Sequence, residues 1–181
     1  MARAEVGVIH GRFQPLHVGH LEYLLAGAER CDTLVVGITN PDPWTSIDEP
    51  SDPGRSRPDA NVCTYYERYL MVEGALADAG VSRERLRIVP FPHGFPERLR
   101  HYAPPDARYF VTVYDAWGEA KIERLRSLGL TVEVMWRRAE KPISGARVRA
   151  AIASGDGWRE LVPPATTKVV EGCGIDVRMR G

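Results

Sequence analysis

The stretch Gly11-Arg12-Phe13-Gln14-Pro15-Leu16-His17-Val18-Gly19-His20 stands between a predicted strand and a predicted helix. The apolar run before it, residues 6–9, is typical of a buried strand, and residues 18–30 carry an apolar face at helical spacing. Glycine and proline mark the turn between the two elements. A strand, a turn and a helix in this order predict one unit of an α/β domain.

The start of the predicted helix has the features of a phosphate site. His17 and His20 are three residues apart, so they share one face of the helix. Free backbone amides and the positive end of the helix dipole favour an anion there. Gly19 removes a side chain that would keep a ligand from the backbone, and Arg12 adds a forked cation. We therefore expect this turn to bind phosphate.

The rest of the chain alternates strands and helices. A capping box begins at Thr64, and Ser144 is a predicted N-cap. Alternation of this kind favours a parallel sheet of about five strands, a Rossmann-like doubly wound α/β fold that binds ligands beyond the carboxyl ends of its strands. We expect a single domain at 1–164 and a C-terminal tail at 165–181. Further strands are predicted at 34–39, 86–91, 109–113 and 130–136, and helices at 64–79, 116–128, 146–153 and 158–162.

The composition limits the partners of the protein. Lys plus Arg and Asp plus Glu are both 24, so the net charge is zero and favours neither nucleic acid nor a membrane surface. No apolar run reaches membrane-spanning length, and the N-terminus lacks the core of a signal peptide. The three cysteines are scattered and lack zinc spacing, so we expect reduced thiols and a cytoplasmic location.

A long proline-marked segment, residues 41–62, follows the second predicted strand. Loops of this length inside a compact domain are usually either functional or disordered. Two interpretations therefore stay open, a lid over the substrate and an insertion without a role. Trp44 slightly favours the lid, because an aromatic side chain on a loop often stacks on a base.

A second candidate phosphate site lies in residues 136–149. Several cations, Arg138 and Arg149 among them, lie before and at the start of a predicted helix. Ser144 supplies a hydroxyl group, and the amides that follow it point out of the helix. We therefore expect this helix start to bind phosphate as well.

Together these motifs resemble the nucleotidyltransferase superfamily with its His-x-Gly-His signature. The longer form in residues 11–20 is most similar to archaeal-type nicotinamide mononucleotide (NMN) adenylyltransferases. Residues 143–149 resemble the Ile-Ser-x-Thr-x-Ile-Arg signature, with Ala146 in the place of Thr. Asn61, Thr64, Glu67 and Arg68 match the family's Asn-Pro-Phe-Thr-x-x-Glu-Arg. We interpret Glu67 and Arg68 as a helix cap and a buried ion pair that orients the loop.

The resemblance implies transfer of a nucleoside monophosphate from a nucleoside triphosphate to a phosphate or phosphonate oxygen, with release of pyrophosphate. No carboxylate cluster has metal spacing, so we expect Mg²⁺ to arrive with the nucleotide. The implied catalytic residues are His17, His20, Arg12 and Arg149, and the implied nucleotide-binding residues are Gly11, Phe13, Gln14, Gly19, Arg138, Ser144, Gly145 and Ala146.

The acceptor segment departs from the NMN enzymes. His93 replaces their Asp, no Trp follows at the matching place, and Arg98 adds a cation. Cations suit a small anion better than a pyridinium ring, although Phe95 or Trp117 could replace the stacking residue. This favours a small phosphonate acceptor, as in the cytidylyltransferases of phosphonate pathways that these sequences also resemble. The predicted acceptor-binding residues are Thr39, Asn40, His93, Arg98, Tyr114 and Asp115.

Three alternatives stay open. The chain could be an NMN adenylyltransferase that uses ATP, or a nucleotide sensor whose site is degenerate at Ala146. A module for DNA or tRNA is disfavoured by the neutral charge. The sequence decides neither between CTP and ATP nor whether the protein forms a homo-oligomer.

Overall fold

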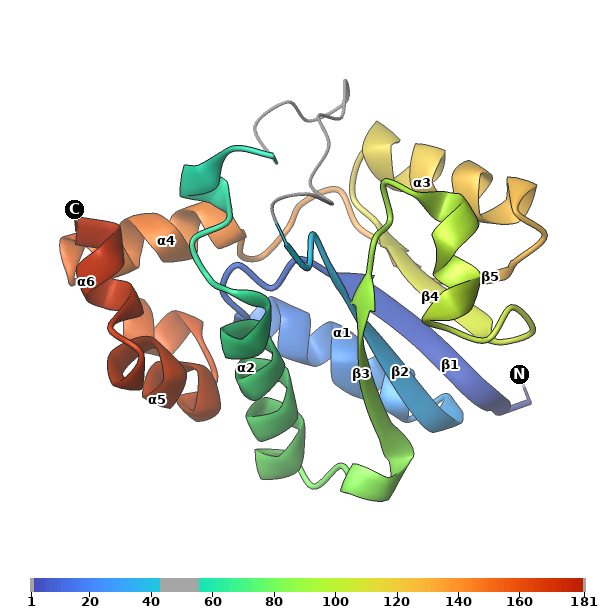
Figure 1. Cartoon of the computed structure of the whole chain (residues 1–181), viewed down its shortest axis with the longest axis horizontal. Coiled ribbons are helices and arrows are strands. Elements are labelled where there is room, and N and C mark those ends of the chain that lie inside the picture. The colour runs from blue at the N-terminus through green and yellow to red at the C-terminus, as the bar shows by residue number, and fades with distance from the viewer. Residues whose placement is uncertain (1, 43–55, 181) are drawn as a thin grey trace.

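A computed structural model of the protein describes residues 2–42 and 56–180. Its centre is a parallel sheet with the strand order β3-β2-β1-β4-β5 (Figure 1). Every neighbouring pair in this order runs parallel, which confirms the predicted five-stranded doubly wound sheet. The strands are β1 (Ala4–Gly11), β2 (Cys31–Thr39), β3 (Leu86–Phe91), β4 (Arg108–Val113) and β5 (Thr131–Arg137).

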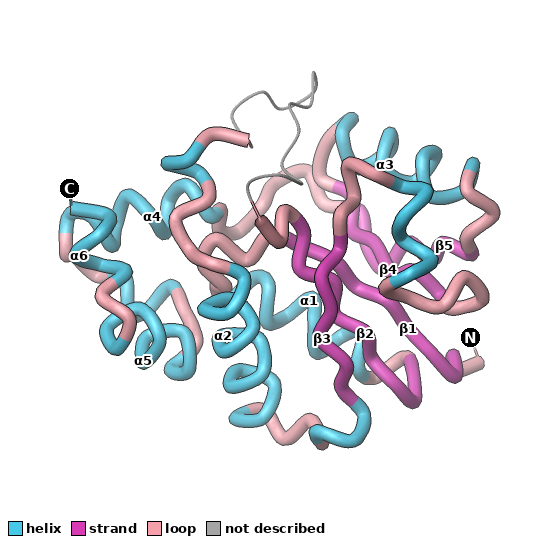
Figure 2. Tube along the Cα trace, in the orientation of Figure 1, coloured by secondary structure: helices cyan, strands magenta, loops and turns pink. Residues whose placement is uncertain are grey.

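Helices cover both faces of the sheet, and short 3₁₀ turns lie in several of the connections between elements (Figures 1 and 2). Each predicted helix is present to within about two residues. The helices are α1 (Val18–Ala28), α2 (Tyr65–Asp78), α3 (Ala116–Ser127), α4 (Gly145–Ser154), α5 (Pro164–Gly172) and α6 (Ile175–Arg180); the 3₁₀ turns are η2 (Pro58–Ala60), η3 (Arg83–Arg85), η4 (Pro96–His101) and η5 (Trp158–Leu161).

Two hydrophobic cores flank the sheet because successive strand residues point to opposite faces. Ile9 of β1 belongs to the larger core, which α1, α2 and the C-terminal helices cover. Val8 belongs to the second core, which α3 and η4 cover. Both side chains are completely buried. A sheet covered on both faces leaves the ends of its strands as the place for a ligand.

The C-terminal residues differ from the predicted tail. Residues 165–181 include α6 and most of α5, and Ala165, Val170 and Ile175 are buried in the larger core. A Cβ placed on Gly74 of α2 would lie 2.9 Å from the Cβ of Ala165, so α5 packs closely on α2. The packing shows no boundary at residue 164, and this segment completes the domain.

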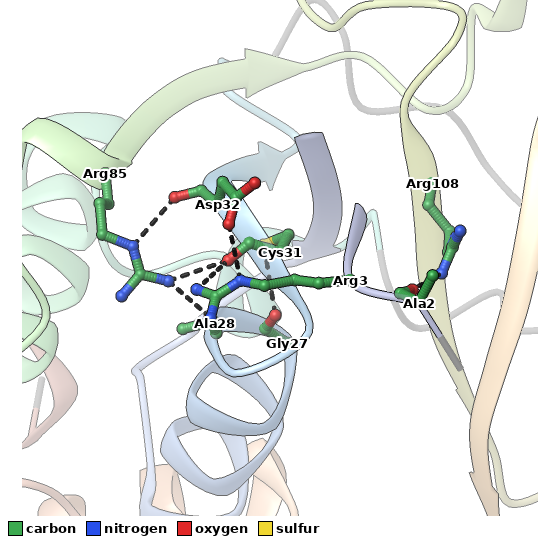
Figure 3. A network of polar contacts seen from close by, with 8 residues as sticks. All are labelled: Ala2, Arg3, Gly27, Ala28, Cys31, Asp32, Arg85 and Arg108. Carbon is green, nitrogen blue, oxygen red and sulfur yellow. Dashed lines mark hydrogen bonds and ion pairs between the residues drawn. The ribbon is translucent and has the colours of Figure 1, made fainter. Parts of the chain in front are cut away.

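The amino end of the sheet is held by arginines (Figure 3). Arg85 donates hydrogen bonds to the carbonyls of Ala28, Cys31 and Asp32, at 2.8 to 2.9 Å. Arg3 donates to the same Cys31 carbonyl and pairs with the carboxylate of Asp32. These contacts join the end of α1, the start of β2 and the turn before β3, at the end of the sheet opposite the carboxyl ends of the strands.

Two further findings concern the sequence predictions. Within residues 2–42 and 56–180, no helix is long and apolar enough to cross a membrane. Trp44 and the middle of the 41–62 segment lie outside the described residues, so the choice between a lid and an insertion stays a prediction. The part of this segment that is described includes η2.

Candidate active site

A cavity of about 430 Å³ opens at the carboxyl ends of β1, β2 and β4. It lies where the strand order changes direction, between β1 and β4, the position expected for a ligand in a doubly wound sheet. Its walls come from the turn after β1, the start of α4 and the β4–α3 junction. Figure 2 shows the loops at this end of the sheet beside α4. The lining of the cavity includes the four predicted catalytic residues, Arg12, His17, His20 and Arg149.

The two predicted phosphate sites are in direct contact. Arg149 of α4 donates from Nη1 to the backbone carbonyl of Gln14, at 2.8 Å. Gly145 makes room for this contact, since a Cβ there would lie 3.2 Å from that nitrogen and 3.3 Å from that oxygen. Partial burial lowers the pKa of Arg149 from its usual value. The cation of the second site therefore lies against the backbone of the first.

The histidine pair forms a reciprocal cap at the start of α1. His17 is the N-cap, and its Nδ1 accepts a hydrogen bond from the amide of His20. The amide of His17 in turn donates to Nδ1 of His20. The rings stack with their centroids 3.6 Å apart. Because each Nδ1 accepts, a neutral ring carries its hydrogen on Nε2.

Burial keeps both histidines neutral. Desolvation lowers the pKa of His17 to about 4. The pKa of His20 also lies well below its usual value, first through desolvation and then through the charges of His17 and Arg12. At neutral pH each ring is therefore a neutral donor at Nε2. Such a group can hold a phosphate oxygen by a hydrogen bond without a fixed positive charge.

Several predicted nucleotide-binding residues shape the turn. Phe13 has a φ of 52°. Its ring and the ring of His20 pack edge to face, with their centroids 5.0 Å apart. The side-chain amide of Gln14 donates from Nε2 to the carbonyl of Cys63, at 2.9 Å, and accepts at Oε1 from the amide of Cys63, at 2.8 Å. A Cβ on Gly11 would lie 2.9 Å from the Phe13 ring. These residues line the cavity, and their contacts hold the turn that carries the histidines.

Gly19 joins the two motifs by close packing. A Cβ at this position would lie 2.9 Å from Cγ2 of Ile143, in the segment that leads into α4. From the sequence, Gly19 is expected to let a ligand approach the backbone. The structure adds the approach of Ile143, which places the start of α4 beside α1.

The predicted ion pair between Glu67 and Arg68 is wrong. Glu67 forms the predicted capping box with Thr64 and pairs with Arg178 of α6, at 2.7 Å. Arg68 is 1% exposed and donates to backbone carbonyls at the ends of β1 and β2. A buried guanidinium can be satisfied by carbonyl oxygens because it carries five donors. Those carbonyls belong to Arg12, Thr39 and Asn40.

Comparison with known proteins assigns the family. The sequence pattern of the family described as cytidylyltransferase-like matches residues 8–151. A phosphonoformate cytidylyltransferase of Streptomyces viridochromogenes is 72% identical over 177 residues, which cover 98% of this chain and 96% of that protein. The chain belongs to the cytidylyltransferase-like family. It is therefore a nucleotidyltransferase.

More distant relatives of this cytidylyltransferase-like chain are adenylyltransferases. A nicotinamide-nucleotide adenylyltransferase of Saccharolobus solfataricus is 26% identical, over 96% of this chain and 94% of that protein. The crystal structure of a bifunctional NMN adenylyltransferase/ADP ribose pyrophosphatase from Francisella tularensis, complexed with AMP and a manganese ion, matches with a TM-score of 0.68 at 14% identity. The match covers 97% of this chain and about half (52%) of that one. It confirms the fold.

The predicted acceptor residues divide into two groups. Thr39, His93, Tyr114 and Asp115 line the cavity, whereas Asn40 is buried with φ of 48° and its carbonyl bound to Arg68. Two predicted cations lie outside the described lining. Arg98 of η4 lies over the ring of Phe95, the residue before η4. Arg138 pairs with Glu22 at 2.7 Å. The side chain of Trp117 lies outside what the structure describes.

Three further basic residues line the cavity wall; no role was predicted from the sequence for His10 or Lys121, and Lys141 was only one of the cations of the second phosphate site. His10 is the last residue but one of β1, directly before the motif. Lys121 lies on α3, and Lys141 pairs with Asp115 at 3.3 Å. His10 could have been found from its place at the carboxyl end of the first strand. Lys121 carries no local signal, because only the packing of α3 brings it to the cavity.

The described part of the chain forms no cage of protein ligands for a metal ion. Among the described residues, no group of three or more His, Cys, Asp and Glu side chains could hold one. Asp115 is the carboxylate among the lining residues, and its oxygens cap α3 and pair with Lys141.

Proposed function

We propose that this chain transfers the CMP group of CTP to a phosphonate oxygen of phosphonoformate and releases pyrophosphate. The observation that carries this proposal is the 72% identity to a phosphonoformate cytidylyltransferase along 98% of the chain. The cavity supports it, because neutral donors, cations and free helix amides surround one space. The archaeal adenylyltransferases, at 26% to 31% identity, give weaker support to NMN as the acceptor.

The reaction is an in-line displacement at phosphorus. A phosphonate oxygen forms a bond to the α-phosphorus of CTP. The bond from that phosphorus to the oxygen that bridges to the β-phosphate breaks, and its electron pair leaves with pyrophosphate. Positioning and stabilisation of charge on the phosphates provide most of the catalysis in such a step.

Each side of the cavity has a distinct part in this proposal. His17 and His20 donate from Nε2 to oxygens of the α- and β-phosphates. Arg149, the Ser144 hydroxyl and the amides of Gly145 and Ala146 hold the β- and γ-phosphates, since they lie at the start of α4. Arg12 holds the acceptor or the α-phosphate.

We propose that Mg²⁺ enters with the nucleotide. Oxygens of the triphosphate and water suit its octahedral preference, and the described residues are consistent with that because their carboxylates form no cage. When bound, Mg²⁺ neutralises charge on the phosphates.

We also keep the cytoplasm and the absence of a nucleic-acid partner as proposals. Cys31, Cys63 and Cys173 are all free, as expected in a reducing compartment. The zero net charge gives no general attraction to nucleic acid.

A matrix of substrates tests the proposed function. Each of the four nucleoside triphosphates is combined with phosphonoformate, hydroxyalkylphosphonates, NMN and nicotinate mononucleotide, and pyrophosphate release is measured. CTP with phosphonoformate should give the highest kcat/KM. The highest value for ATP with NMN would contradict the proposal, and no release with any pair would favour a nucleotide sensor.

A further inference from the structure

A small pocket continues the main cavity on the α3 side of the sheet. It has a volume of about 60 Å³ and shares His10, His93 and Lys121 with the cavity wall. We call it the His10–Lys121 pocket. It lies across the sheet from the face that α1 covers.

Alternation along β1 builds this pocket. Val8 and His10 point to the same face because they are two residues apart, and Val8 lies in the core that α3 covers. The His10 ring stacks on Phe91 with a centroid distance of 4.6 Å. Leu99 and Leu125 add apolar walls. His10 therefore lies where the second core ends and the ligand cavity begins.

The charged side chains that line the pocket, among the residues that the structure describes, are basic. Lys121 and Arg124 of α3 line it, and His10 and His93 add imidazole nitrogens. Among the described residues that line it, none is Asp or Glu. Lys121 is half-buried, so its ammonium group is screened less by water than that of a fully exposed lysine. This surrounding favours an anion.

The size of the pocket limits the anion. At about 10–15 Å³ for each water-sized sphere, it holds roughly four to six heavy atoms. A carboxylate and the atom that bears it fit this space, whereas a nicotinamide ring with its amide is too large. The main cavity has room for roughly 30–40 such spheres by the same measure, enough for a nucleotide.

We propose that the His10–Lys121 pocket binds the carboxylate of the acceptor, so that the enzyme selects phosphonates that carry a second anionic group. The inference rests on the proposed function, since phosphonoformate joins a carboxylate directly to phosphorus. With the carboxylate beside Lys121 and His93, the phosphonate lies in the main cavity, where the triphosphate is held. Lys121 supplies the charge, and the two imidazoles supply hydrogen bonds.

Substitution of Lys121 tests this assignment. Lys121→Gln keeps a polar side chain that is one atom shorter and removes the charge. The control, Arg126→Gln, removes an exposed charge of the same helix that pairs with Glu123. We expect Lys121→Gln to raise KM for phosphonoformate about 10- to 100-fold, because hydrogen bonds to charged groups are strong. The KM for CTP and kcat should change less than about threefold. Lys121→Arg should restore part of the loss, and Arg126→Gln should behave as the wild type.

Methylphosphonate, which lacks the carboxylate, is measured as a competitor of phosphonoformate. Its inhibition constant should be nearly the same for the wild type and Lys121→Gln. An equal loss of affinity for both ligands, or no loss for phosphonoformate, would overturn the assignment. If Lys121→Gln fails to fold by thermal melting, His93→Gln is measured in its place with the same expectations. A wild-type enzyme that releases no pyrophosphate from CTP and phosphonoformate would overturn the proposed function, and this inference with it.

Discussion

The helix cap formed by the stacked histidines decides which of their ring nitrogens can donate to a ligand. Their Nδ1 atoms are committed to backbone amides, so only the Nε2 hydrogens can meet a phosphate. The sequence predicted the pair and its place. It did not predict the stacking or the neutral state, because burial of His17 depends on segments distant in the chain.

Removal of the second imidazole should affect turnover more than binding. His20→Ala should lower kcat about 10²- to 10³-fold, because a donor to charge that builds in the transition state is lost. KM for CTP should change less than about threefold. Steady-state pyrophosphate release measures both values, and His101→Ala on the exposed surface is the matched control. Unchanged turnover in His20→Ala would remove this residue from the mechanism.

The low pKa of His17 links stability to pH. The folded protein holds this pKa at about 4, whereas the unfolded chain has the usual value of about 6.5. Between these values the unfolded state binds more protons, so the free energy of unfolding falls as the pH falls from 6.5 to 4. The loss amounts to about 3 kcal/mol at pH 4.

Urea unfolding at a series of pH values measures this linkage. In His17→Gln the free energy of unfolding should depend less steeply on pH between pH 6.5 and 4, because the titrating group is gone. The exposed His101→Gln should keep the wild-type slope. Identical slopes in the wild type and His17→Gln would show that His17 titrates normally in the folded protein.

Most elements were predictable from the sequence, and the exceptions have physical causes. Residues 158–162 were expected to form a short helix that ends before two prolines, and the domain was expected to end at residue 164. Pro164 instead occupies the first turn of α5, where its missing amide and fixed φ are compatible with a helix. The role of Arg68 was missed because its carbonyl partners at the ends of β1 and β2 lie 28 to 56 residues away in sequence.

Contact between α1 and the segment before α4 should be sensitive to one methyl group. Gly19→Ala places a Cβ 2.9 Å from Cγ2 of Ile143, so one segment must move. We expect KM for CTP to rise about tenfold, since the two halves of the phosphate site separate. Ile143→Ala removes that atom, so the double variant should regain part of the affinity. Kinetics of both single variants and the double variant provide the test, and additive losses would contradict it.

A substitution at the amino end of the sheet should lower stability without changing activity, because the cavity lies at the carboxyl ends of the strands. Arg85→Ala removes three hydrogen bonds to carbonyls at the amino end and should cost about 1–3 kcal/mol of unfolding free energy. It should leave kcat/KM unchanged, because the cavity lies at the opposite end. Arg83→Ala, in the same turn but with only a surface pair to Glu73, should cost less than about 1 kcal/mol. Denaturant unfolding and pyrophosphate release on the same samples measure this, and a loss of activity with intact stability would contradict it.

The full chain unites two motifs that are more than a hundred residues apart in sequence. The local patterns around His17 and Arg149 predicted two phosphate sites, and the parallel order of strands predicted that both lie at one end of the sheet. The hydrogen bond from Arg149 to Gln14 shows how directly they meet. The His10–Lys121 pocket was less predictable, since Lys121 reaches it only through the packing of α3.

The central claim is that the imidazole pair and the start of α4 hold one triphosphate. A crystal structure with the α,β-methylene analogue of CTP tests it most directly. We expect Nε2 of His17 or His20 and the guanidinium of Arg149 to contact oxygens of the same triphosphate. Phosphates that contact only one of these groups, with the other facing empty solvent, would contradict the account.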